Sequence, residues 1–176
     1  FAGLAGATGE PVWCDRAVEV LDQAVTRFGA PDGSFLDAEG SDLLTVTAHT
    51  LTDDACPSAT ASMVMALRRV GLMAERDDFV RRADEASGAL LPVVASTPRF
   101  AGWALADFLI ADEARRGLKP AGVVIADTQE EPTDLAAAAW RMAPAGSAIM
   151  RRVGEGSGFG TWFEDRAPRD GQPMCW

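Results

Sequence analysis

Residues 58–70 read SATASMVMALRRV, and residues 98–111 read PRFAGWALADFLIA. The first stretch has no charge before Arg68, and the second has only Arg99 and Asp107. A helix without a polar face must be enclosed by other helices or by membrane. Both stretches are shorter than the roughly 20 residues that a membrane span needs. We therefore predict two helices that are enclosed in a protein core.

Each apolar stretch follows a segment in which apolar and charged side chains separate onto different faces of a helix. In residues 12–28 the apolar face consists of Trp13, Ala17, Val20, Leu21, Ala24 and Phe28. In residues 76–90 it consists of Phe79, Ala83, Ala86 and Leu90. Amphipathic helices of this kind keep one face in water. The order outer, inner, outer, inner predicts two concentric layers of helices, as in a toroid of helical hairpins.

The pattern changes after Arg116. A β-branched run (GVVIA), an Ala-rich helical segment and a second strand-like run (SAIMRRV) follow one another within about 30 residues, which is typical of a βαβ unit. We predict parallel strands at residues 123–126 and 148–151, with a helix at residues 135–142 between them. The predicted parts of the chain are therefore helical hairpins (1–116), a βαβ element of the same domain (117–153) and an irregular C-terminal segment (154–176).

Composition excludes several classes of function. The 176 residues carry a net charge of −10, and 48% of them are hydrophobic. Such acidity argues against binding to nucleic acid, which rests on Lys and Arg, and against an anionic membrane surface. Three cysteines without a CxxC pair (Cys14, Cys56 and Cys175) predict free thiols and a reducing compartment, which we take to be the cytoplasm. With His49 as the single histidine we expect no metal site, and we expect no cofactor.

A long stretch, GAPDGSFLDAEGSDLLTVTAHTLTDDACP at residues 29–57, separates the first outer helix from the first inner one. Residues 43–47 within it favour a short strand. Connections of this length are uncommon in compact domains and are often functional. By contrast, the glycines at positions 3, 6 and 9 and the run GEGSGFG (154–160) lack the strand–turn–helix context of nucleotide-binding loops. We expect both to be flexible connections.

The candidate chemistry gathers at the end of this stretch. Asp53 and Asp54 precede the apolar helix, where a pair of carboxylates could act as acid and base. The alternative is that they favour the N-terminus of the helix, where Ser58 or Thr60 is a plausible cap. His49 could act as a base near neutral pH, although an ordinary loop histidine stays the alternative. Asp107, in an apolar helix, needs a hydrogen-bond partner.

Several motifs resemble one family in the order in which that family has them. The run DDACPSATAS resembles the Asp-Gly-Ala-x-Pro-Ser-Gly-Asn-Ser signature of thioredoxin-domain-containing proteins related to spermatogenesis-associated protein 20. PDGSFLDAEG is similar to that family's Asp-Gly-Gly-Phe-Phe-Asp loop. KPAGVVIAD and FEDRAPRDGQPMCW are similar to its late strand and closing segment. This chain departs from the signature at Asp54, Ala59, Thr60 and Ala61.

The resemblance implies a thioredoxin-like domain followed by an (α/α)6 toroid of the six-hairpin glycosidase type, similar to N-acylglucosamine 2-epimerases. The expected fold is thus mainly α, a partial toroid with a small C-terminal βαβ element, and the chain would be a fragment of a bacterial protein. It would pack on the missing N-terminal part and bind a small carbohydrate. The catalytic candidates are Asp53 and Asp54, and the substrate-binding candidates are Phe35, Asp37, His49, Ser58 and Thr60. Two functions are open: a sugar epimerase, isomerase or glycosidase activity, and a non-catalytic scaffold. Aromatic side chains near the acidic loops would favour a sugar site, and Phe35 is the candidate visible in the sequence.

Overall fold

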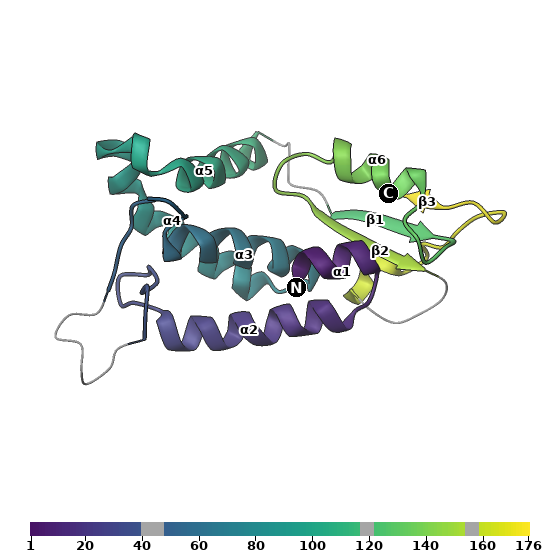
Figure 1. Ribbon diagram of the computed structural model, residues 1–176, viewed down its shortest axis with the longest axis horizontal. Coiled ribbons are helices and arrows are strands. Elements are labelled where there is room, and N and C mark those ends of the chain that lie inside the picture. The colour runs from purple at the N-terminus through teal and green to yellow at the C-terminus, as the bar shows by residue number, and fades with distance from the viewer. Residues whose placement is uncertain (40–47, 117–121, 154–158) are drawn as a thin grey trace. The chain divides into compact units, whose positions relative to one another are not determined.

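The computed structural model describes residues 1–39, 48–116, 122–153 and 159–176. The chain is mainly helical with a small three-stranded sheet (Figure 1). The helices are α1 (Ala2–Thr8), α2 (Val12–Phe28), α3 (Ala59–Met73), α4 (Asp77–Ser96), α5 (Gly102–Arg115) and α6 (Asp134–Met142), with short 3-10 helices η1 (Pro98–Phe100) and η2 (Gly160–Phe163). The strands are β1 (Gly122–Asp127), β2 (Ala148–Val153) and β3 (Met174–Cys175). The strand predicted at residues 43–47 lies outside the described residues.

The chain forms two compact units that interleave in sequence. Unit 1 comprises Phe1–Glu19, Arg69–Arg76 and Pro120–Trp176, and unit 2 comprises Val20–Arg68 and Asp77–Lys119. The boundaries between the units fall within α2 and α3. Each of these two helices therefore contributes residues to both units.

The sheet of unit 1 has the strand order β2-β1-β3. Strands β1 and β2 are parallel, with Val124 opposite Met150, and α6 connects them (Figure 1). The predicted βαβ element is thereby confirmed. The tail, predicted to be irregular, adds β3 antiparallel to β1. Val124 and Trp176 exchange two backbone hydrogen bonds of 3.1 and 3.0 Å. Two residues of strand are too few to produce an alternating sequence pattern, which is why the pattern did not reveal β3.

Both faces of the sheet are covered. One face contributes to an apolar cluster made of Ala5, Cys14, Met73, Val124, Ala148, Met150, Phe159 and Phe163. The other face contributes to a second cluster made of Ile125, Ile149 and Ala136, the last of which lies on α6. Successive residues of a strand point to opposite faces, so Val124 and Ile125 enter different clusters. A β-branched run without alternation is the expected sequence of a strand buried on both sides.

The first helix of unit 1 lies against β2. A Cβ atom placed on Gly6 would come within 2.4 Å of the backbone oxygen of Ile149, so glycine permits this close approach. Gly9 ends α1 in the left-handed conformation, with φ of 76°. The expectation of a flexible connection at the first glycines is therefore wrong, because Gly3 and Gly6 are helical. Most of the second glycine-rich run, residues 154–158, lies outside the described residues.

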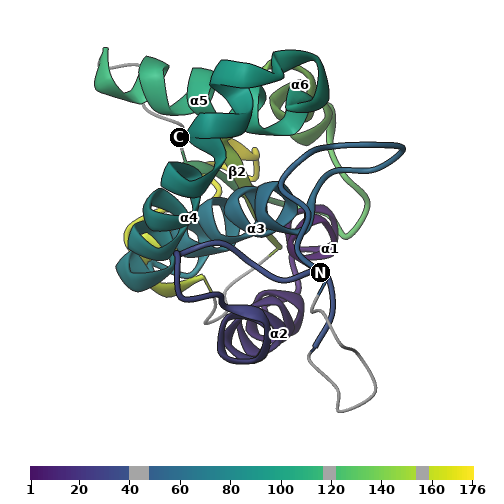
Figure 2. The same ribbon diagram turned by 90° about the vertical axis from the view of Figure 1, so that its left-hand side faces the viewer.

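The helix α4 of unit 2 is labelled in Figure 2, and its charged residues other than Arg82 are exposed. Its predicted apolar face is buried, with Ala83 and Ala86 fully so, whereas Arg81 and Glu85 are exposed. On α3, which runs through both units, Ser62 is the one exposed residue. The contrast between an amphipathic helix and an enclosed one is confirmed for this pair. On α2 the agreement is incomplete, because Val20 is 49% exposed.

The prediction of one enclosed helix over residues 98–111 is wrong in two respects. The segment is divided into η1 and α5, because Ala101 is not helical (φ −142°, ψ 33°). In addition, α5 is open on one side, with Trp103 46% and Leu109 66% exposed. An apolar sequence predicts that a helix will be covered, but these two large side chains of α5 are exposed.

Two further expectations concern the membrane and the thiols. No helix in the described part of the chain combines the length and the apolar character needed to cross a bilayer. Cys14, Cys56 and Cys175 are free thiols, as the odd count and the spacing predicted. Cys14 is buried, and this burial, reinforced by the charge of Asp15, raises its thiol pKa.

Candidate functional site

The loop that follows α2 is fixed by side chains from α3 and α4. Arg82 donates hydrogen bonds to the backbone oxygens of Gly33 and Ser34, at 2.6 and 3.3 Å. Its guanidinium group lies 4.3 Å from the centre of the Phe35 ring. The hydroxyl of Thr60 accepts from the backbone nitrogen of Phe35 and donates to its oxygen, at 3.0 and 3.3 Å. Phe35 is fully buried, so its ring is not available to a ligand.

Within this loop, Ser34 joins Asp32 to His49. The carboxylate of Asp32 accepts from the hydroxyl and the backbone nitrogen of Ser34, at 2.5 and 3.0 Å. These two bonds, helped by the charge of His49, hold the pKa of Asp32 below its usual value. The Ser34 hydroxyl also lies 2.6 Å from Nε2 of His49. In a catalytic triad the histidine stands between serine and aspartate, whereas here a fully buried serine stands between the other two. The cluster therefore anchors the loop at His49 to the turn at Asp32.

Asp37 strengthens the same connection. Its backbone nitrogen donates to the oxygen of Ala48 at 2.9 Å, and its carboxylate accepts from the backbone nitrogen of Thr50 at 2.8 Å. Asp37 and His49 are both exposed. The acidic loop and the histidine predicted from the sequence are thus brought together, by backbone pairing and through Ser34.

Asp53 makes contacts in two directions. One carboxylate oxygen accepts from the backbone nitrogen of Ser58 at 3.0 Å, and the other accepts from that of Trp103 at 2.9 Å. The backbone nitrogen of Asp53 donates to the oxygen of Phe100 at 2.7 Å. The neighbouring Asp54 is exposed. Asp53 thereby joins the start of α3 to the start of α5.

The two acidic loops meet at the first turn of α3. The first loop is bonded to Thr60, and the second is bonded to Ser58 through Asp53. Ser58 also caps α3, because its hydroxyl accepts from the backbone nitrogen of Ala61 at 3.2 Å. Ser58 and Thr60 are buried with these internal partners. Among the predicted site residues, those with exposed side chains are Asp37, His49 and Asp54.

Sequence reasoning missed two exposed aromatic residues whose backbones are bonded to Asp53. Phe100 is 44% and Trp103 is 46% exposed, and both are bonded through their backbones to Asp53. The apolar pattern of residues 98–111 predicted an enclosed helix, so neither was considered as a surface residue. Gly102 was the available signal, because a glycine destabilises the interior of a helix relative to alanine and so argues against a continuous helix.

Asp107 has the partners that its burial requires. Its carboxylate, 2% exposed, accepts from Arg68 at 2.5 Å and from the hydroxyl of Ser87 at 2.8 Å. Arg68 also bonds Asp84 at 2.6 Å. Burial alone would lower the pKa of Arg68, but the carboxylates of Asp107 and Asp84 raise it above its usual value. The expectation of a structural partner is confirmed, and the cluster joins α3, α4 and α5.

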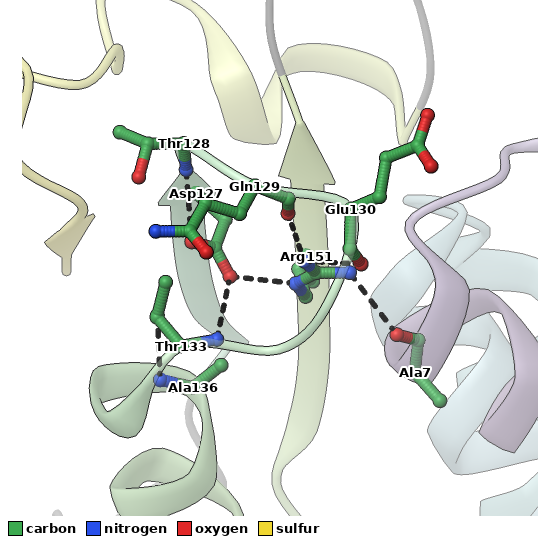
Figure 3. A network of polar contacts seen from close by, with 8 residues as sticks. All are labelled: Ala7, Asp127, Thr128, Gln129, Glu130, Thr133, Ala136 and Arg151. Atoms are coloured by element: carbon green, nitrogen blue, oxygen red, sulfur yellow. Dashed lines mark hydrogen bonds and ion pairs between the residues drawn. The ribbon is translucent and has the colours of Figure 1, made fainter.

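In unit 1, the place where parallel α/β sheets bind ligands is filled by the protein itself. Ligands bind beyond the carboxyl ends of parallel strands. There, Asp127 at the end of β1 bonds Arg151 of β2 at 2.7 Å, and both side chains are fully buried (Figure 3). Arg151 also donates to the backbone oxygens of Ala7, Gln129 and Glu130. Its donors are directed at protein atoms, so this edge of the sheet has a structural role.

No cluster of three or more metal-binding side chains occurs among the residues that the structure describes. Asp54, which follows Asp53 in the chain, and Phe100 and Trp103, which are bonded to Asp53 through their backbones, are exposed. No protein-family model matches the chain, and a search of curated proteins finds no match to it.

Proposed function

We propose that this chain is the C-terminal portion of an (α/α)6 toroid in a thioredoxin-domain-containing protein, and that it binds carbohydrate. The motifs in their order support the family, and the mainly helical fold with its small sheet is compatible with it. The free thiols suit the cytoplasm, where we place the protein.

The observation that carries the proposal is the pair of exposed aromatic residues at Asp53. We name the set Asp53, Asp54, Phe100 and Trp103 the Asp53 surface. Aromatic rings offer large, flat apolar areas, on which the C–H groups of a sugar ring can stack. Carboxylates accept hydrogen bonds from sugar hydroxyls. Phe35, the aromatic residue expected to fill this role, is replaced in the proposal by Trp103, because Phe35 is buried.

The proposal is for binding rather than turnover. General acid–base catalysis requires a group that can give and take a proton at the substrate. Both carboxylate oxygens of Asp53 already accept backbone N–H groups. Asp54 is the exposed carboxylate of the pair. The Asp53 surface therefore has the groups to hold a sugar, but it does not present two carboxylates free to act as a matched acid and base.

Affinity electrophoresis tests the proposal, with the chain run through gels that contain laminarin, xyloglucan or galactomannan. At least one polysaccharide should retard the wild-type protein. Trp103→Ala should weaken this binding about tenfold or more, as loss of a central aromatic contact does. Trp140→Ala is the matched control, since Trp140 is similarly exposed (40%) but lies on α6. Absence of retardation in every gel, or equal losses in the two variants, would refute carbohydrate binding at this surface.

A second candidate function is a scaffold that packs on a thioredoxin-like domain. It is favoured by the open side of α5, where Leu109 is 66% exposed. Contiguous exposed apolar surface is typical of sites where another protein packs. Leu109→Ser separates the two functions, because it should abolish binding of a thioredoxin-like domain, measured by calorimetry, and leave polysaccharide binding unchanged.

A further inference from the structure

The inference starts from the break between η1 and α5. In a continuous α-helix from residue 98 onward, the nitrogen of Trp103 would bond the oxygen of Arg99, and the oxygen of Phe100 would accept from Ala104. Asp53 takes both of these groups instead: its backbone nitrogen bonds the oxygen of Phe100 at 2.7 Å, and its carboxylate bonds the nitrogen of Trp103 at 2.9 Å. The break at Ala101 is thus bridged by one residue from another loop.

The same residue is fixed at its other end. The second carboxylate oxygen of Asp53 accepts from the backbone nitrogen of Ser58 at 3.0 Å, and Ser58 caps α3. A helix N-terminus leaves backbone N–H groups without partners inside the helix, and an acceptor from outside can satisfy them. Asp53 does so for α5 and bonds the capping residue of α3. The segment that carries Phe100 and Trp103 is therefore held relative to α3, the enclosed helix.

We infer that Asp53 is a positioning residue of the Asp53 surface and not a proton-transfer group. In this role Asp53 holds Phe100 and Trp103 where a sugar can stack on them. This inference rests on the proposed carbohydrate binding. A ligand that stacks on two rings requires a fixed arrangement of those rings, and preorganisation of a site increases affinity by reducing the ordering cost of binding. Without the Asp53 carboxylate, the N–H group of Trp103 and that of Ser58 lose their acceptor.

Three variants of the 176-residue chain test this role: Asp53→Ala, Asp53→Asn and Thr133→Ala. Asp53→Ala removes both carboxylate acceptors, whereas Asp53→Asn keeps one carbonyl oxygen. Thr133→Ala removes the cap of α6 in unit 1 and serves as a control for loss of a helix cap. Hydrogen exchange of peptides covering residues 98–106 reports on the segment directly, and affinity electrophoresis reports on binding.

Asp53→Ala should speed exchange in residues 98–106 at least tenfold and weaken polysaccharide binding about tenfold, at a temperature at which circular dichroism shows every variant to be folded. Asp53→Asn should retain part of both properties, because a proton carrier is not required. Thr133→Ala should change neither. Unchanged hydrogen exchange of residues 98–106 in Asp53→Ala would overturn the inference, whether or not the chain binds a polysaccharide. If Asp53→Ala bound polysaccharide normally and Trp103→Ala did not, the inference about Asp53 would be overturned and the proposed function would stand. Failure of the wild-type protein to bind any polysaccharide would overturn the proposed function and this inference together.

Discussion

Arg151 is the side chain on which the polar contacts of the small sheet converge. It is fully buried, pairs with Asp127 and bonds three backbone oxygens from two other segments (Figure 3). A buried ion pair adds little compared with apolar residues of the same size, but removal of one partner leaves an uncompensated charge. The main effect of the pair is therefore to fix the positions of α1 and of the loop after β1. Removal of one partner should reveal this effect as a loss of stability.

The first prediction follows from that asymmetry. Asp127→Asn, which keeps the shape of the side chain but removes its charge, should lower the free energy of unfolding by about 3–5 kcal/mol. Urea denaturation measures this loss. Glu131→Gln neutralises an exposed carboxylate close by in the sequence and should change stability by less than about 0.5 kcal/mol. Equal effects of the two substitutions would contradict a dominant role for the ion pair.

The second prediction concerns pH. Burial would raise the pKa of Asp127, but the hydrogen bonds from Arg151, Thr128 and Thr133 outweigh it and lower the pKa below the ordinary value of 3.8. A carboxyl group with a lowered folded-state pKa contributes stability that is complete above 3.8 and is lost as the pH falls through the folded value. The unfolding free energy of the wild-type chain should therefore fall more steeply in acid than that of Asp127→Asn. Parallel curves for the two proteins would show that Asp127 does not contribute in this way.

Single residues also show why part of the site could be predicted and part could not. The need of Asp107 for a partner followed from its apolar surroundings in the sequence, and Arg68 and Ser87 supply it. Phe35 was expected at the sugar site because it lies beside acidic residues. It is buried instead, and Arg82, from a helix distant in the sequence, lies over its ring. A single sequence indicates which side chains are near one another along the chain, but not which distant side chain covers them.

At the scale of elements, the βαβ unit was predictable because each of its parts has a strong local signal. Strand β1 is a β-branched run, β2 contains Ile149 and Val153, and the helix is Ala-rich with Thr133 as the N-cap. The division of residues 98–111 into η1 and α5 was not predictable in this way. Gly102 is the one local signal there, and the backbone groups of Phe100 and Trp103 that a continuous helix would use are bonded to Asp53, 50 residues before Trp103. Tertiary contacts of this kind override local helical propensity.

The third prediction compares two glycines of α1. A Cβ atom on Gly6 would come within 2.4 Å of the backbone oxygen of Ile149, whereas nothing lies within 4 Å of one on Gly3. Gly6→Ala should therefore lower stability by about 1–3 kcal/mol, because the helix must move away from β2. Gly3→Ala should raise it by about 0.5–1 kcal/mol through helix propensity. Thermal denaturation of both variants measures the difference. Similar shifts of the same sign would show that α1 does not lie against β2 as described.

At the scale of the whole molecule, the main feature is that two compact units share two helices. Unit 1 is assembled from three separate stretches of the chain, and unit 2 takes up the stretches between them. Since α2 and α3 contribute to both, no single cut of the chain separates the units. Helix formation is cooperative along a helix, so loss of structure at one end of α2 or α3 disfavours the other end. This connectivity predicts that the two units unfold together.

The fourth prediction tests that cooperativity with one substitution in each unit. Gly6→Ala destabilises unit 1, and Asp107→Asn weakens the pairing with Arg68 in unit 2. If the units unfold together, each variant should reduce the protection of backbone amides in both β1 and α4, as measured by hydrogen exchange in low concentrations of urea. Far-UV circular dichroism should show a single transition that moves to lower urea for each variant. If each substitution instead reduced protection in its own unit alone, α2 and α3 would have to unravel at the boundary between the units, and the chain would behave as two independently stable parts.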